Sequence, residues 1–108
     1  MNVIKRSGEE LAFDVSKIEN AITKANNATD LSHRTTAEVI HDITERVSNK
    51  CKSLKRSVSV EEIQDMVENE LMKAQVFQVA HNYITYRYER ALVRKANTTD
   101  QKILSLLE

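Results

Sequence analysis

Two pairs of cationic side chains are the residues of this chain best suited to chemistry. Lys5 and Arg6 are adjacent and stand just before Gly8, the only glycine in the sequence. Arg87 and Arg90 are three residues apart, so on a helix they would lie side by side. Fixed ammonium and guanidinium groups bind phosphate oxygens through charge-assisted hydrogen bonds. The sequence therefore offers donors suited to gripping a phosphate chain.

The Lys5-Arg6 pair belongs to a stretch that predicts a β-hairpin followed by a helix. Ser7-Gly8 suits a two-residue turn, because glycine adopts φ > 0 without a Cβ clash. With this turn, Ile4 pairs with Leu11 and the two share a face. An isolated hairpin is not stable in water, so this one must lie on the rest of the protein. It is either a capping flap with a solvated tip or a lid that carries its cations over a helix N-terminus.

Apolar residues at helical spacing predict four helices. The first begins at an Asp14 N-cap and ends near Asn26-Asn27. After a polar connection, the second runs from about Thr36 to near Lys50, and the third follows Ser59. The fourth extends from about Val76 to Ala96. The expected inner faces are Val15, Ile18, Ala21, Ile22 and Ala25; Val39, Ile40, Ile43 and Val47; Ile63, Met66, Val67, Leu71 and Ala74; and Val76, Val79, Ala80, Tyr83 and Ile84.

Local signals mark the ends of these helices. Thr35 to Glu38 and Ser59 to Glu62 both match the capping-box pattern, with Thr35 and Ser59 as caps. We interpret the basic run from Lys50 to Arg56 as a solvated loop, followed by a short third strand at Ser57-Val58. Asn97 to Asp100 is expected to end the last helix.

These elements predict an α+β fold that is mainly α: a four-helix bundle capped by a small N-terminal β-hairpin, which the third strand can extend. The absence of proline and the single glycine agree with a mainly helical protein. We place the domain at residues 1–96 and a linker, or the start of a following domain, at 97–108. The apolar run Ile103 to Leu107 is typical either of a piece cut from a longer polypeptide or of a C-terminal helix that folds back on the bundle.

Composition excludes several classes of function. Sixteen Lys and Arg residues balance sixteen Asp and Glu residues, so no overall field favours nucleic acid or an anionic membrane. The single cysteine excludes an internal disulfide and fits a reducing compartment. The sequence shows no signal peptide and no apolar run long enough to cross a bilayer. We therefore expect a cytoplasmic location.

No catalytic set is visible. One glycine cannot build a Gly-rich phosphate loop. His33, His41 and His81 have no metal-ligand spacing, and we interpret each as a surface or partly buried residue. Basic neighbours are expected to lower the pKa of Cys51, but no pair of histidine and acid supports it as a nucleophile. We therefore expect no metal site and no enzyme activity from this chain on its own.

Four stretches occur in an order that is characteristic of one family. They are Val3-x-Lys5-Arg6-x-Gly8; Phe13-Asp14-x-x-Lys17-Ile18 with Ala21-Ile22; Val60-Glu61-Glu62-Ile63-Gln64-Asp65-x-Val67-Glu68 with Leu71-Met72; and Val79-Ala80-x-x-Tyr83-Ile84-x-Tyr86-Arg87-x-x-Arg90. Together they cover about residues 2–95 and resemble the ATP-cone, the regulatory nucleotide-binding domain at the N-terminus of many ribonucleotide reductases. Ser7 stands where many members carry Asp, and a turn tolerates either residue.

The resemblance also implies a set of site residues. Lys5 and Arg6 match the family's phosphate-gripping pair, and Lys17 matches its first-helix lysine. Arg87 and Arg90 match its Tyr-Arg-x-x-Arg end. By the same matching, the base and ribose contacts are Val3, Ile18, Val60, Ile63 and Gln64. Asp14 could accept from ribose hydroxyls or serve only as a helix cap, and Tyr86 could stack on the base or direct its hydroxyl to a phosphate.

The implied function is allosteric. ATP or dATP, together with Mg²⁺, would signal to the catalytic domain of the same polypeptide, with dATP as the off signal in the synthesis of DNA precursors. The implied partners are adenine nucleotides, the catalytic domain and further copies of the same protein in a nucleotide-dependent homo-oligomer. Neither a membrane nor a nucleic acid is implied as a partner. The general sequence pattern of the domain, and the residues Asn97 to Asp100 that follow it, favour one class of reductase. This class is the large subunit of the anaerobic ribonucleoside-triphosphate reductase, which is oxygen-sensitive and uses a glycyl radical.

Two alternatives from other classes stay open. The first is a nucleotide-responsive transcriptional repressor of reductase genes, which carries the same cone behind a zinc ribbon. Against it, the chain begins at Met1 directly with the hairpin and lacks a four-cysteine set. The second is a helical protein-interaction module that binds no nucleotide.

Overall fold

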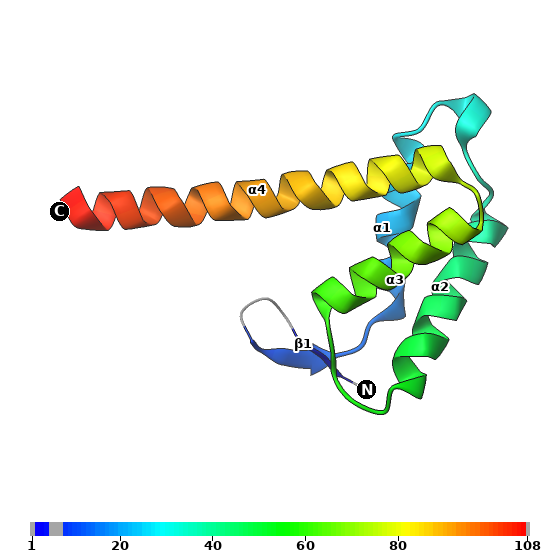
Figure 1. Ribbon diagram of the computed structural model, residues 1–108, viewed down its shortest axis with the longest axis horizontal. Helices are drawn as coiled ribbons and strands as arrows, with labels where there is room; N and C mark the ends of the chain where they lie inside the picture. The colour runs from blue at the N-terminus through cyan, green and yellow to red at the C-terminus, as the bar shows by residue number, and fades with distance from the viewer. Residues whose placement is uncertain (1, 5–7, 108) are drawn as a thin grey trace.

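The protein folds into four helices with a small sheet at one end (Figure 1). The computed structural model describes the backbone of residues 2–4 and 8–107, and the side chains of these residues as far as Val93. The elements in chain order are β1 (Asn2–Ile4), β2 (Glu10–Ala12), α1 (Val15–Asn27), the 3-10 turn η1 (Leu31–His33), α2 (Ala37–Ser53), β3 (Val58–Ser59), α3 (Val60–Lys73) and α4 (Phe77–Leu107). Helices α1 and α3 each pack against both α2 and α4. The predicted mainly helical α+β fold is confirmed.

The sheet is mixed and has the order β2-β1-β3. Strands β1 and β2 are antiparallel, whereas β1 and β3 are parallel, so the expected third strand is present, although it covers Val58–Ser59 and not Ser57-Val58. The expected register was wrong by one residue, because Val3, not Ile4, lies opposite Leu11. The pairing of Ile4 with Glu10 is incompatible with a two-residue turn at Ser7-Gly8, and a shift of one residue exchanges the two faces of a strand. Gly8 does adopt φ +88°, as predicted.

Helix α1 starts and ends where the sequence indicates. Asp14 is its N-cap and accepts a 3.0 Å hydrogen bond from the Ser16 amide. At the other end Asn26 is buried, and its side-chain amide bonds both the carbonyl and the amide of Thr35 at 3.1 and 2.9 Å. The polar connection between α1 and α2 is thus held by a buried asparagine.

Helix α2 differs from expectation at both ends. Its N-cap is Thr36 rather than Thr35, and the Thr36 hydroxyl accepts from the Val39 amide at 3.2 Å. The helix continues through Ser53, so the first part of the basic run is helical and not a loop. The reason is Cys51, which is fully buried and extends the apolar face of α2 by one turn. The chain then reverses through Lys55, which has φ +53°.

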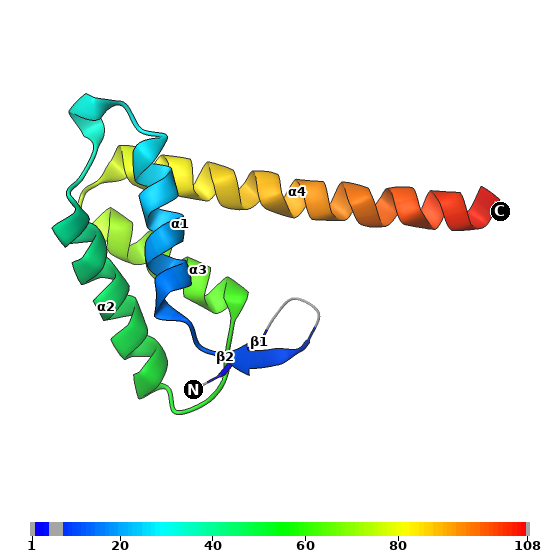
Figure 2. The same ribbon diagram turned by 180° about the vertical axis from the view of Figure 1, so that it is seen from behind.

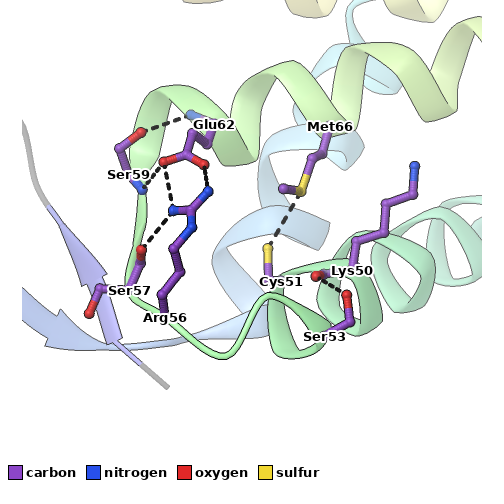
Figure 3. Close-up of polar contacts among 8 residues, drawn as sticks. All are labelled: Lys50, Cys51, Ser53, Arg56, Ser57, Ser59, Glu62 and Met66. Atoms are coloured by element: carbon purple, nitrogen blue, oxygen red, sulfur yellow. Dashed lines mark hydrogen bonds and ion pairs between the residues drawn. The ribbon is translucent and has the colours of Figure 1, made fainter.

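Helix α3 is fixed at its start by the predicted capping box (Figure 3). The Ser59 hydroxyl accepts from the Glu62 amide at 3.1 Å, and the Glu62 carboxylate accepts from the Ser59 amide at 3.3 Å. Arg56 adds two hydrogen bonds to the same carboxylate, at 2.7 and 3.2 Å. Near its end, the buried carboxylate of Glu70 meets the Lys50 ammonium of α2 at 3.0 Å. Helix α3 is therefore tied at both ends by ionic contacts.

Helix α4 is longer than predicted. It runs unbroken through Asn97 to Asp100, so the expectation that these residues end the helix was wrong. Its first half packs on α1 and α3, while its second half projects past the hairpin (Figures 1 and 2). Ile84 was expected on the inner side but is 42% exposed. Tyr83, one residue earlier, takes the inner position and is buried.

The core joins all four helices and β3. The buried apolar residues come from the predicted stripes, with Cys51 and Val58 added. Within the part of the chain that the structure describes, no helix is both long and apolar enough to cross a membrane.

Candidate functional site

The hairpin, α1 and α3 enclose a mainly apolar pocket of about 260 Å³, which we call the apolar pocket. Its walls come from the strands, the first two turns of α1 and the start of α3, and Tyr83 of α4 contributes the remaining side. The lining residues are Val3, Leu11, Ala12, Phe13, Asp14, Lys17, Ile18, Ala21, Val60, Ile63, Gln64, Val67 and Tyr83. The corrected hairpin register matters here, because it places Val3 and Leu11 side by side on the pocket wall.

A second pocket of about 370 Å³ lies between α1 and α4, and we call it the cationic pocket. It is lined by Lys17, Asn20, Ala21, Lys24, Gln64, Tyr83, Tyr86, Arg87 and Arg90. No described residue of this lining is a carboxylate. Lys17, Ala21, Gln64 and Tyr83 line both pockets, so the two adjoin along one boundary. A ligand with an apolar head and an anionic tail could occupy both.

Every predicted site residue that the structure describes lines one or both of these pockets. In the apolar pocket these are Val3, Asp14, Ile18, Val60 and Ile63; in the cationic pocket they are Tyr86, Arg87 and Arg90; and in both they are Lys17 and Gln64. Lys5 and Arg6 lie outside the described residues. The structure thus brings together residues that are more than eighty positions apart in sequence, such as Val3 and Arg90.

Asp14 caps α1, as one of its two predicted roles requires. One of its carboxylate oxygens accepts from both the Ser16 amide at 3.0 Å and the Ser16 hydroxyl at 2.6 Å. These hydrogen bonds, with a smaller contribution from the charge of Lys17, hold the pKa of Asp14 below its usual value. The carboxylate is therefore ionised at neutral pH, and Asp14 is one of the residues that line the apolar pocket.

Arg87 is bound to three carboxylates of α3, which its position in the sequence did not predict. Its Nη1 atom lies 2.8 Å from Asp65 and 2.7 Å from Glu68, and its Nη2 atom lies 2.8 Å from Glu61. Partial burial lowers the pKa of the Arg87 guanidinium, but the hydrogen bonds to the three carboxylates outweigh it and raise the pKa above its ordinary range. Although Arg87 lines the cationic pocket, its charge is already matched by α3.

Several lining residues were missed by reasoning from the sequence. Asn20, Ala21 and Lys24 follow Lys17 at intervals of three, four and seven residues, which is the spacing of one helix face. That spacing was a usable signal for Asn20 and Lys24. Tyr83 was predicted as a core residue, and it is both buried and part of the two pockets.

Cys51 lies away from both pockets and is not activated. It is buried between α2 and α3, where its thiol donates to the Met66 sulfur at 3.7 Å (Figure 3). Burial, and then the charge of Glu62, raise the pKa of Cys51, so the expected lowering was wrong. The nearby cations Lys50 and Arg56 are paired with Glu70 and Glu62, whereas the thiol is buried in the core.

The three histidines are exposed and lie on different elements. His33 contacts Asp30 at 2.7 Å, within the connection between α1 and α2. Among the described residues, no group of three or more His, Cys, Asp or Glu side chains is arranged to hold a metal ion.

The two adjoining pockets occur on a chain whose residues 1–92 match the family model described as the ATP cone domain. The chain belongs to the ATP-cone family. This match covers the hairpin, the first three helices and the part of α4 that lines the pockets. The ATP-cone resemblance is therefore confirmed.

Relatives of the chain are reductases of several kinds. It is 33% identical over 94% of its length to the ribonucleoside-diphosphate reductase subunit alpha of Chlamydia muridarum. It is 34% identical over 98% of its length to the anaerobic ribonucleoside-triphosphate reductase of Haemophilus influenzae. A vitamin B12-dependent ribonucleoside-diphosphate reductase of Thermoplasma acidophilum is 37% identical over 86% of the chain. The aligned region makes up 10%, 15% and 12% of these proteins, respectively. The chain is thus related to a small part of each.

Proposed function

We propose that this ATP-cone domain binds ATP or dATP as an allosteric effector. The observation that carries the proposal is the boundary shared by the apolar and cationic pockets, formed by Lys17, Ala21, Gln64 and Tyr83. Adenine is flat and largely apolar, whereas the triphosphate is highly charged, and a nucleotide therefore needs both environments next to each other.

The base fits the apolar pocket, between Val3 of the sheet, Ile18 of α1 and Ile63 of α3. The triphosphate then extends into the cationic pocket. The ribose lies at the shared boundary, which includes Gln64, and Asp14 lines the adjoining apolar pocket. The hairpin cations Lys5 and Arg6 complete the phosphate site in this proposal, and Mg²⁺ arrives with the phosphates, since no described carboxylate lines the cationic pocket.

The bound nucleotide acts as a signal and not as a substrate. The described residues around the two pockets include neither a Gly-rich phosphate loop nor a histidine, and Asp14 is occupied as a helix cap. In the proposed role, the domain reports the nucleotide to a reductase catalytic domain, with dATP as the off signal. ATP and dATP differ by one hydroxyl, so they can switch a protein only if its two states contact them differently. The relatives include diphosphate, triphosphate and vitamin B12-dependent reductases, and the anaerobic class stays our preference among them.

Calorimetric titration of the 108-residue chain with ATP and with dATP tests this proposal. We expect binding at about micromolar strength, and a weakening of roughly ten- to a hundredfold in Lys5→Ala or Arg6→Ala. Lys52→Ala, on the exposed side of α2, is the matched control and should leave the affinity unchanged. Incubation with ATP and Mg²⁺ should release no phosphate above the buffer blank. An absence of heat and of thermal stabilisation with either nucleotide would refute the proposal.

One observation favours a second function, that of a protein-interaction module without nucleotide. Helix α4 exposes Ile84, Tyr88, Leu92 and Val93, of which Tyr88 is 64% and Val93 55% exposed. Exposed apolar side chains in a row along a helix are typical of a surface that binds a partner. If ATP left the melting temperature unchanged while a partner raised it, this second function would be the correct one.

A further inference from the structure

Four basic side chains line the cationic pocket, but they differ in whether their charge is already paired with a carboxylate. Arg87 is only one-fifth exposed and is bound by Glu61, Asp65 and Glu68. The other three are Lys17, Lys24 and Arg90, which are all exposed. Among the described residues, none of these three makes a hydrogen bond or ion pair with a carboxylate. An anion that enters this pocket can therefore bind these three cations.

Lys24 lines the cationic pocket but does not belong to the boundary that this pocket shares with the apolar pocket. Lys17 and Lys24 are seven residues apart on the same face of α1, which corresponds to roughly 10 Å along the helix axis. Lys17 lines both pockets, whereas Lys24 lines only the cationic one. An anionic tail that starts at the shared boundary meets Lys17 first and reaches Lys24 only if it is long.

We propose that Lys24 binds the distal phosphate of the nucleotide and sets the preference of the domain for triphosphates over monophosphates. This inference rests on the proposed nucleotide-binding function and goes beyond the residues matched to the family. It assigns a specificity role to a residue of the last turn of α1, where a lysine also has a simple structural role opposite the negative end of the helix dipole. The structural role predicts the same effect with every nucleotide, while the proposed role predicts an effect that grows with the number of phosphates.

The test compares ATP, ADP and AMP by calorimetry on four forms of the chain: unaltered, Lys24→Gln, Lys24→Arg and the control Lys52→Gln. Glutamine is close to lysine in helix propensity and removes the charge at this exposed position, so the variant should fold. We expect Lys24→Gln to weaken ATP binding about tenfold or more and AMP binding less than twofold. Lys24→Arg should recover most of the ATP affinity, and Lys52→Gln should match the unaltered chain with all three nucleotides.

The outcomes separate this inference from the function on which it rests. Suppose that the unaltered chain binds ATP. If Lys24→Gln then binds ATP equally well, or if its affinities for ATP and AMP fall by the same factor, Lys24 does not bind the distal phosphate. If the unaltered chain binds none of the three nucleotides, the nucleotide-binding function is wrong and this inference falls with it.

Discussion

The Nη1 atom of Arg87 lies 2.7 Å from a carboxylate oxygen of Glu68, which joins α4 to α3. Asp65 and Glu61 complete the cluster at 2.8 Å each. Arg87 and Glu68 are 20% and 24% exposed, so this contact is partly shielded from water and from salt. The cluster also connects two helices that line the apolar and cationic pockets. It should therefore contribute to stability more than an ordinary surface ion pair does.

Our first prediction is that Arg87→Met destabilises the fold. The substitution removes the guanidinium that Glu61, Asp65 and Glu68 share, and we expect the free energy of unfolding to fall by about 2–3 kcal/mol. Urea denaturation followed by circular dichroism measures this change. Arg90→Met, one turn later and exposed, is the matched control and should change the same quantity by less than about 0.5 kcal/mol. Equal losses in both variants would show that the cluster has no special role.

The second prediction concerns acid. Hydrogen bonds from Arg56, and then from the Ser59 amide, lower the pKa of Glu62 from 4.5 to about 2. A carboxyl group whose pKa is lower in the folded state stabilises the fold above its unfolded pKa. That contribution is lost as the pH falls from about 4.5 towards 2. Unfolding curves between pH 5 and 2 should therefore decline less steeply in Glu62→Gln than in the unaltered chain. Parallel curves would mean that the Arg56 contact does not persist in solution.

The third prediction concerns alkali. Burial, opposed by the charge of Arg87, raises the pKa of Tyr83 from 10.0 to about 12. Folding favours the neutral phenol, so the contribution of this group is complete below pH 10 and is lost as the pH rises towards 12. A spectrophotometric titration should show one tyrosine that ionises late, and Tyr83→Phe should remove that phase. A titration unchanged by this substitution would contradict the buried position of Tyr83.

Local signals were enough to predict most of the fold. Asp14 and Ser59 cap helices through bonds to residues two and three positions away, and such bonds depend only on nearby sequence. The hairpin register could not be predicted from such local signals, because Val3 also pairs with Val58 in the neighbouring strand β3. The end of α2 likewise depends on the burial of Cys51 against α3. Errors arose where a distant element decides the local structure.

The candidate site residues were predicted from the family pattern, but the pairing of charges within the site was not. The pattern identified Lys17 and Arg87 as equivalent donors, yet only the fold shows that Arg87 is matched by acids of α3. Glu70 is a related case, since nothing in its local sequence indicates a buried carboxylate. Lys73 of its own helix lies 3.8 Å away, but the shorter contact, at 3.0 Å, comes from Lys50 of α2. Pairing of charges across helices cannot be read from spacing along a single helix.

The fourth prediction tests the boundary between the two pockets. Ala21 is partly buried and lines both of them, so a larger side chain there should obstruct a ligand that spans them. We expect Ala21→Phe to weaken ATP binding about tenfold or more, with little change in melting temperature, because the new ring fills space that is open in the free protein. Ala37→Phe, at the exposed start of α2, controls for the added apolar surface. Undiminished binding in Ala21→Phe would separate the pockets as two unrelated sites.

The last prediction ties nucleotide identity to assembly, as the proposed allosteric role requires. Lys17, Lys24 and Arg90 place exposed positive charge between α1 and α4, which would repel the same surface of a second copy. A bound triphosphate cancels this charge and bridges α1 to α4, and this presents one fixed face for docking.

A coupling of about 1–3 kcal/mol is sufficient, since it changes an association constant about five- to 150-fold. We therefore expect dATP to give larger assemblies than ATP in a protein that contains the catalytic domain, and a weaker form of the same effect in this 108-residue chain. Light scattering behind size exclusion, at saturating nucleotide, measures the masses. The same masses with ATP, with dATP and without nucleotide would place the switch within one chain, because charge cancellation between copies could not then be its mechanism.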